Sequence, residues 1–197
     1  MDDVARRRRA AALAGHHDDE PAARALLADP SPAVRSTALG ALARLRAAGP
    51  ADVADALADP DPTVRRRACE VAGGVADVDL RPALADAEPS VVEAAAWAIG
   101  ERGRGTSGAV DDLARVAGGH EDALCREAAV AALGAIGDER GLPAIVAATA
   151  DRPAVRRRAV IALAPFAGPE VDAALQRALS DRDRQVRQAA EDLTGDR

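Results

Sequence analysis

The sequence lacks several residue types that particular chemistries require. Its 197 residues include no lysine, asparagine or tyrosine, and only one tryptophan, one phenylalanine and two cysteines. Without lysine there can be no P-loop lysine and no Schiff base, and without asparagine no N-glycosylation site. Two cysteines do not form a disulfide framework, which favours a reducing cytoplasm. No apolar run approaches the ~20 residues of a membrane span, so we expect a cytoplasmic protein without membrane contact.

Alanine and arginine dominate what is present. The chain has 52 alanines and 26 arginines, and 48% of its residues are apolar. Alanine is the best helix former and β-branched residues are scarce, so the composition favours an all-α fold. Abundant Ala, Arg, Gly and Pro without Lys or Asn is typical of a G+C-rich bacterial genome.

A short motif recurs along the chain. Pairs of the Val-Arg type begin at residues 34, 64, 91, 125, 155 and 186, at spacings of 27 to 34 residues. With the first residue of each pair as position 1, apolar residues fall at positions 1, 5, 8, 9 and 12. This 3.6-residue period predicts an amphipathic helix repeated six times. Shorter helices are predicted before most of them, at residues 21–28, 51–58, 109–117, 142–150 and 169–179.

The repeated unit resembles HEAT repeats. Its pattern is Asp-x-x-x-x-Val-Arg-x-x-Ala-x-x-Ala-Leu-Gly-x-Ile-Gly, and residues 125–138 are the best copy. The resemblance is to the short bacterial type named after phycobiliprotein (PBS) lyases. It implies an all-α, right-handed α-α superhelix, a HEAT-like solenoid of about six helix pairs plus an N-terminal cap helix at about residues 3–15. The repeats cover about residues 20–194 of a single domain, 1–197.

The same resemblance implies a structural role for the motif's charged residues. Each arginine is expected to join neighbouring turns in an inter-repeat ladder of charge-assisted hydrogen bonds. Arg65 is expected to pair with Asp59, six residues before it. The ladder is expected to break where Asp86 faces Val92 and where His120 replaces the aspartate. The predicted ladder residues are Asp29, Arg35, Asp59, Arg65, Arg126, Arg156, Asp181 and Arg187.

Three features that suggest chemistry do not support an enzyme. His120-Glu121 is similar to the His-Glu pairs with which deoxyhypusine hydroxylases hold iron, but those pairs follow Val-Arg, where this chain has no histidine. Residues 103–108 match G-x-G-x-x-G, yet a helix rather than a strand is predicted before them. We interpret them as an extended inter-repeat loop, and anion binding there stays open. Cys69 and Cys125 are predicted core residues too far apart to pair. No catalytic residue, metal ligand or cofactor is predicted.

The face that resembles a HEAT concave surface comes from positions 3, 4, 7 and 11 of the long helices. Trp97 stands off the buried stripe, with Glu93 and Glu101 one turn to either side. It is either an exposed anchor for a partner or packed against the next repeat, and both possibilities stay open. The predicted partner-binding residues are Trp97, Glu93, Glu101, Arg66, Arg67, Glu70, Glu127, Arg157, Arg158 and Ile161.

The charge distribution limits the class of partner. Residues 51–100 contain ten acids and four arginines, and such an acidic middle repels phosphate. HEAT-like DNA glycosylases also use a tryptophan with an acid four residues on, as at Trp97 and Glu101, but they need further aromatics and a basic cleft. A bilin lyase-type activity is implied only by the family resemblance. We therefore expect a non-catalytic scaffold or adaptor that binds a protein or peptide, with a monomer favoured.

Overall fold

The computed structural model describes residues 3–195, apart from the side chain of Ser107, so the ends of the predicted domain lie outside the described residues. Within this range the chain forms twelve α-helices and three short 3-10 helices, and no strand. The long helices are α1 (Asp3–Ala14), α3 (Pro32–Arg44), α5 (Pro62–Ala72), α6 (Pro89–Arg102), α8 (Ala123–Ile136), α10 (Pro153–Ala162) and α12 (Arg184–Gly195). The other elements are α2 (Glu20–Ala25), α4 (Pro50–Leu57), η1 (Arg81–Ala85), η2 (Gly103–Ala109), α7 (Val110–Gly119), η3 (Glu139–Gly141), α9 (Leu142–Ala148) and α11 (Pro169–Ala178).

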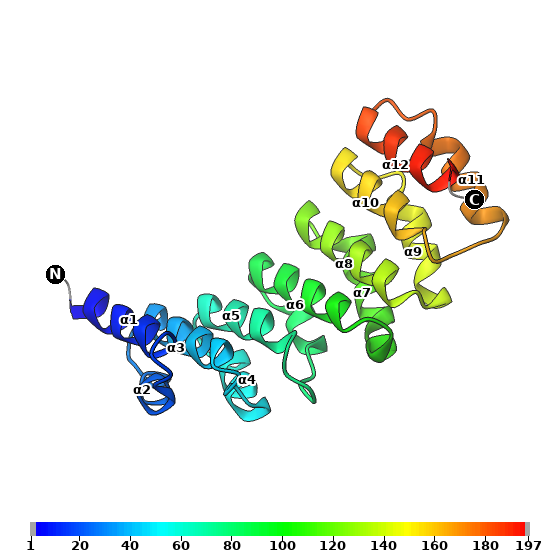
Figure 1. Ribbon diagram of the computed structural model, residues 1–197. Coiled ribbons are helices and arrows are strands. Elements are labelled where there is room, and N and C mark those ends of the chain that lie inside the picture. Colours follow the sequence, from blue (N-terminus) through cyan, green and yellow to red (C-terminus); the bar gives the residue numbers. More distant parts are fainter. Residues whose placement is uncertain (1–2, 196–197) are drawn as a thin grey trace. The chain divides into compact units, whose positions relative to one another are not determined.

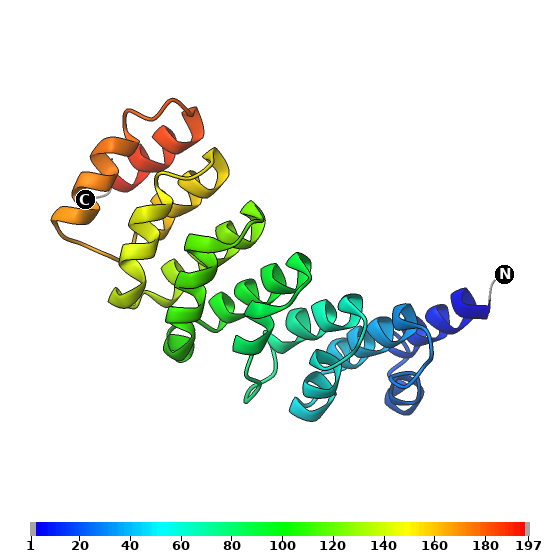
Figure 2. The ribbon, with the colours of Figure 1, turned by 180° about the vertical axis from the view of Figure 1, so that it is seen from behind.

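The chain divides into two compact units, residues 1–95 and 96–197, and the division falls within α6. In the first unit α1, α3 and α5 lie side by side, and α2 and α4 form a second layer against them (Figures 1 and 2). In the second unit α8, α10 and α12 form one layer, and α7, α9 and α11 form the other. Each unit is therefore a stack of helix pairs, as the repeated motif predicts.

The predicted stripe forms the core. In the repeat that contains α10 the residues at positions 1, 5, 8, 9 and 12 are all buried, with Val155 0% and Ala162 6% exposed. Position 6 is buried as well, for example Leu39 in α3 and Val130 in α8, because two layers of helices enclose a wider face than the stripe alone. Cys69 and Cys125 also lie in the core as free thiols, as predicted.

The irregular spacings of the motif have local causes. The 27-residue spacing reflects a first helix that shrinks to the five-residue 3-10 helix η1. The 34-residue spacing reflects η2, which adds seven residues before α7. The prediction of an extended loop at residues 103–108 is therefore wrong. Gly103 takes a φ of +61°, and the Thr106 hydroxyl donates to the Gly103 carbonyl oxygen at 2.7 Å. The segment therefore turns into the 3-10 helix η2 instead of running as an extended loop.

Neighbouring long helices approach closely at glycines. A Cβ placed on Gly134 of α8 would lie 2.7 Å from the Cβ of Ala162 in α10, and one on Gly100 would lie 3.0 Å from the Cα of Ala132. Both distances are shorter than ordinary carbon contacts, so these positions require glycine for packing. In the described part of the chain no helix is long and apolar enough to cross a membrane.

Candidate functional site

Arginines at the start of the long helices connect successive turns in both units. Arg35 donates from Nε and Nη2 to the Asp59 carboxylate, both at 2.7 Å, and donates from Nη1 to the backbone carbonyl of Asp29 at 2.9 Å. The guanidinium therefore holds its own turn through a carbonyl and the next turn through a carboxylate. The same pairing with the next turn joins Arg7 to Asp29, Arg65 to Asp86, Arg126 to Asp151 and Arg156 to Asp181.

This geometry corrects two predictions about the ladder. Arg65 does not pair with the carboxylate of Asp59. Its Nη1 donates to the Asp59 carbonyl oxygen, and its Nη2 donates to the Asp86 carboxylate. Asp86 is consequently part of the ladder, and the expected break in this copy lies at Val92, which has no guanidinium to offer. Arg187 donates to the Asp181 carbonyl at 2.6 Å. Sequence reasoning missed Arg7, Asp86 and Asp151 as members of ion pairs. Asp86 occupies the motif's aspartate position, but Asp151 precedes Arg156 by five residues instead of six.

His120 takes over one function of the aspartate that it replaces. In four other turns an Asp carboxylate accepts a hydrogen bond from the amide two residues on, as Asp59 does from Asp61 at 2.9 Å. His120 accepts the corresponding bond from the Asp122 amide at its Nδ1, at 3.0 Å. His120 therefore preserves this hydrogen bond of the turn without a carboxylate. The preceding copy of the motif has Val92 at its arginine position, so no arginine there needs a carboxylate at residue 120.

The ladder lowers the pKa of its carboxyl groups. Hydrogen bonds from the arginine outweigh the opposing effect of burial and hold the pKa of Asp86, Asp151 and Asp181 below the ordinary aspartate value. For Asp59 burial is the largest single influence and would raise the pKa, but Arg35 and the Asp61 amide together lower it. These ion pairs join successive turns of the chain.

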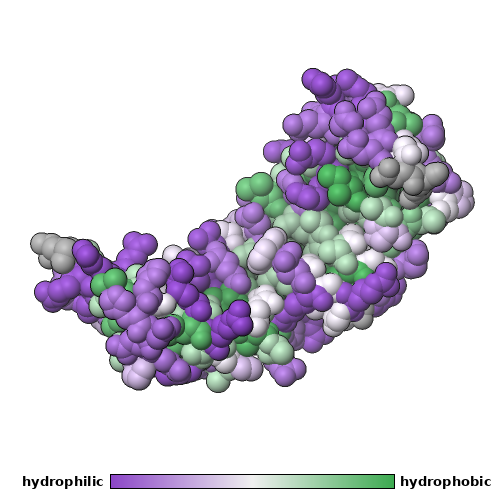
Figure 3. Space-filling view, in the orientation of Figure 1, coloured by the Kyte–Doolittle hydropathy of each residue, from purple (hydrophilic) through white to green (hydrophobic). Residues whose placement is uncertain are grey.

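The long-helix face of the second unit carries two exposed apolar side chains. We use "long-helix face" for positions 3, 4, 7 and 11 of the long helices. Trp97 in α6 is 54% exposed and Ile161 in α10 is 43% exposed. Between them α8 presents Ala131 and Ala135, whose small side chains project less far from the helix than Trp97 and Ile161 do. Hydrophobic surface gathers over α8 to α10 in the space-filling view (Figure 3).

The charged residues of this face are arranged unequally. Glu101, one turn after Trp97, is exposed and has no ion pair among the described residues. Glu127 lies 3.4 Å from Arg158, and Arg157 is half-buried beside it. The Nε atoms of Arg157 and Arg158 are buried without an acceptor in the described part of the chain. The α6 side of the face is thus acidic, and the α10 side is basic.

The remaining predicted site residues lie in the first unit. Glu70 accepts from Arg67 at 2.6 Å and lies 3.5 Å from Arg66, so three of the predicted residues form one cluster on α5. Glu93 is exposed on α6 and makes no ion pair with any described residue. Each predicted partner-binding residue is at least partly exposed, and whether any of them binds a partner stays a prediction.

Metal ligands do not gather in the described residues. No group of three or more His, Cys, Asp or Glu side chains there could hold a metal ion. Burial raises the pKa of the Cys69 thiol to about 12, so it is not a nucleophile at neutral pH. Gly105 and Gly108 of the Gly-rich segment have open space where a Cβ would stand.

Comparison with known proteins agrees with the stacked helix pairs. The family of HEAT repeats matches residues 78–154, and the PBS lyase HEAT-like repeat matches residues 155–181. No curated protein matches significantly.

Several solved structures share the fold. YibA of Escherichia coli is 18% identical with a TM-score of 0.68, and the match covers 91% of this chain and 71% of that one. A designed armadillo repeat protein in complex with peptide (KR)4 is 17% identical with a TM-score of 0.62, covering 98% and 99%. Human deoxyhypusine hydroxylase is 23% identical with a TM-score of 0.51, covering 96% and 78%.

Stacked helix pairs tied by arginine and aspartate define a helical repeat protein of the solenoid class. Within that class, the matched repeats show that this chain belongs to the HEAT-repeat proteins, of the PBS lyase HEAT-like type.

Proposed function

We propose that the protein is a non-catalytic, cytoplasmic scaffold or adaptor that binds a protein or peptide on its long-helix face. The observation that carries the proposal is the exposure of Trp97, the only tryptophan, at 54%. An exposed indole loses contact with water when a partner covers it, and buried tryptophans dominate the binding energy of many interfaces.

The charges around Trp97 favour a basic side chain in the partner. Glu93 and Glu101 occupy the helical turns before and after the tryptophan and are free of ion pairs with described residues. A Lys or Arg side chain could lie on the indole face, where cation–π attraction adds to the attraction of the carboxylates. The designed repeat protein that shares this fold is in complex with the basic peptide (KR)4, which supports a basic ligand as the first probe.

A fluorescein-labelled peptide of four Lys-Arg repeats provides the test by fluorescence anisotropy. We expect Trp97→Ala to weaken binding by more than about 2 kcal/mol, or roughly thirtyfold. Leu124→Ala is the matched control, because Leu124 is 56% exposed but lies off the long-helix face. Equal affinity for the parent protein and the Trp97 variant would overturn the proposal for this ligand class.

A further inference from the structure

A cleft in the first unit lies where one repeat has a reduced first helix. The residues between α5 and α6 form only η1, a five-residue 3-10 helix, where the preceding repeat has the eight-residue α4. A 3-10 helix has three residues per turn and is thinner than an α-helix. From η1 only Pro82 and Ala83 line the cleft, and Pro50, Ala54 and Ala58 opposite them stay exposed.

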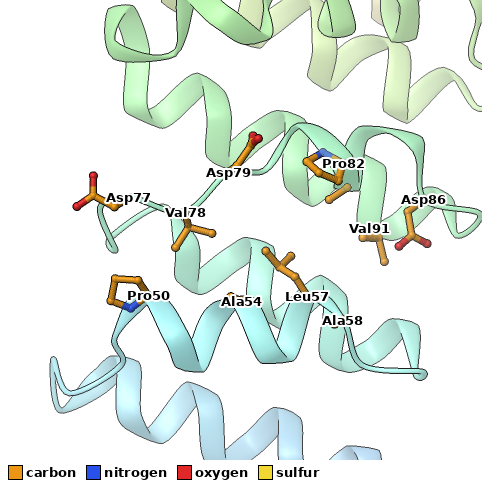
Figure 4. A pocket seen from close by; sticks show the side chains of 11 residues that line it. Pro50, Ala54, Leu57, Ala58, Asp77, Val78, Asp79, Pro82, Asp86 and Val91 are labelled. Atoms are coloured by element: carbon orange, nitrogen blue, oxygen red, sulfur yellow. The ribbon is translucent and has the colours of Figure 1, made fainter.

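The cleft has a volume of about 420 Å³ and a mainly apolar lining (Figure 4). Pro50, Ala54, Leu57 and Ala58 line it from α4, at the spacing of one helix face. Val78 and Pro82 line it from the opposite side. Successive turns of α4 place the exposed residues Pro50, Ala54 and Ala58 here, so an apolar side chain from outside can reach the floor of the cleft.

Negative charge marks one end of the cleft. Asp77 lies at the same end as Pro50, is exposed, and has no ion pair with a described residue (Figure 4). Its φ of +61° holds the backbone in the left-handed region. The other acids of the lining are already paired, Asp79 with Arg81 and Asp86 with Arg65. Residues 51–100 contain ten acids and four arginines, so the surroundings attract a cation.

We propose that this α4 cleft binds a short amphipathic segment of a partner protein, with apolar side chains against α4 and an Arg or Lys beside Asp77. From Pro50 to Ala58 the face runs eight residues, which at the helical rise is about 12 Å, or two turns of a bound helix. The segment supplies the apolar surface that η1 does not. This second binding surface is independent of Trp97.

The test uses the full chain and a labelled twelve-residue amphipathic helical peptide of Leu, Ala and Arg. Ala54→Trp fills the cleft from an exposed helix position and is expected to weaken binding at least tenfold. Ala51→Trp is the matched control, since Ala51 is exposed on α4 but does not line the cleft. Asp77→Asn keeps a residue that tolerates a left-handed backbone and should weaken binding about threefold. Asp18→Asn controls for it, because Asp18 has a φ of +56° outside the cleft.

Peptide binding that Ala54→Trp weakens, and that Ala51→Trp and Trp97→Ala leave unchanged, would support the α4 cleft. Equal affinity for the Ala54 and Ala51 variants would overturn it, as would the absence of binding to the parent protein. Binding lost only in Trp97→Ala would overturn the cleft while supporting the long-helix face. A peptide in which Glu replaces every Arg should bind more weakly, and equal binding would overturn the role of Asp77.

Discussion

Arg65 and Asp86 stand 21 residues apart in the chain and are joined by two parallel hydrogen bonds of 2.7 and 2.9 Å. The same guanidinium donates to the Asp59 carbonyl at 2.9 Å. One side chain therefore connects two successive turns of the first unit. Because the pair is mostly shielded from water, with Arg65 19% and Asp86 11% exposed, it contributes more than a surface ion pair.

Arg65→Ala is expected to lower the free energy of unfolding by about 1–3 kcal/mol, because Asp86 would keep its burial and lose its main donor. Urea denaturation followed by circular dichroism measures the loss. Arg66→Ala is the neighbouring control, since Arg66 is 47% exposed and its contact with Glu70 is 3.5 Å long. A loss no larger than that of the control would mean that packing alone holds the turn.

Acid should weaken the protein through the same carboxylates. The pKa of Asp86, Asp151 and Asp181 is lower in the folded chain than the ordinary value of about 3.9. Their stabilisation is therefore complete above pH ~4 and decreases as the pH falls towards the folded values. Urea midpoints at pH 7, 4 and 3 should show this decrease, and the decrease should be smaller in Arg65→Ala. A pH-independent midpoint over this range would contradict the ladder's electrostatic role.

Gly134→Ala is expected to destabilise the second unit by about 1–3 kcal/mol, because the new methyl group would meet the backbone and side chain of Ala162. Gly118→Ala, in α7, has open space around the new carbon and should stabilise by about 0.5–1 kcal/mol. Thermal melts of the two variants compare them directly. A neutral or stabilising effect at Gly134 would refute the close approach of α8 and α10.

Both thiols should resist modification in the native protein. Cys69 and Cys125 are each 0% exposed, and burial raises the pKa of the Cys69 thiol to about 12. An aromatic disulfide reagent at pH 8 should therefore detect two thiols only after denaturation. Rapid reaction of either thiol without denaturant would show that the core opens more readily than its packing indicates.

Periodicity predicted the long helices and their buried stripe because each helix repeats the same apolar spacing. It also placed Trp97 off that stripe, but its degree of exposure depends on how closely the neighbouring helices approach. The ladder partners were misassigned because six residues separate Asp59 and Arg65 in sequence, whereas the guanidinium reaches the following turn. The α4 cleft could not be predicted, since Arg-Pro-Ala-Leu-Ala at residues 81–85 is as compatible with an α-helix as with η1.

The most direct test of the proposed function is the accessibility of Trp97 to acrylamide, with and without the Lys-Arg repeat peptide. Because Trp97 is the only tryptophan, its fluorescence reports on this position alone. We expect red-shifted, readily quenched emission in the free protein and clear protection when the peptide is bound. Blue-shifted emission that acrylamide does not quench in the free protein, or quenching unchanged at saturating peptide, would contradict Trp97 as the anchor.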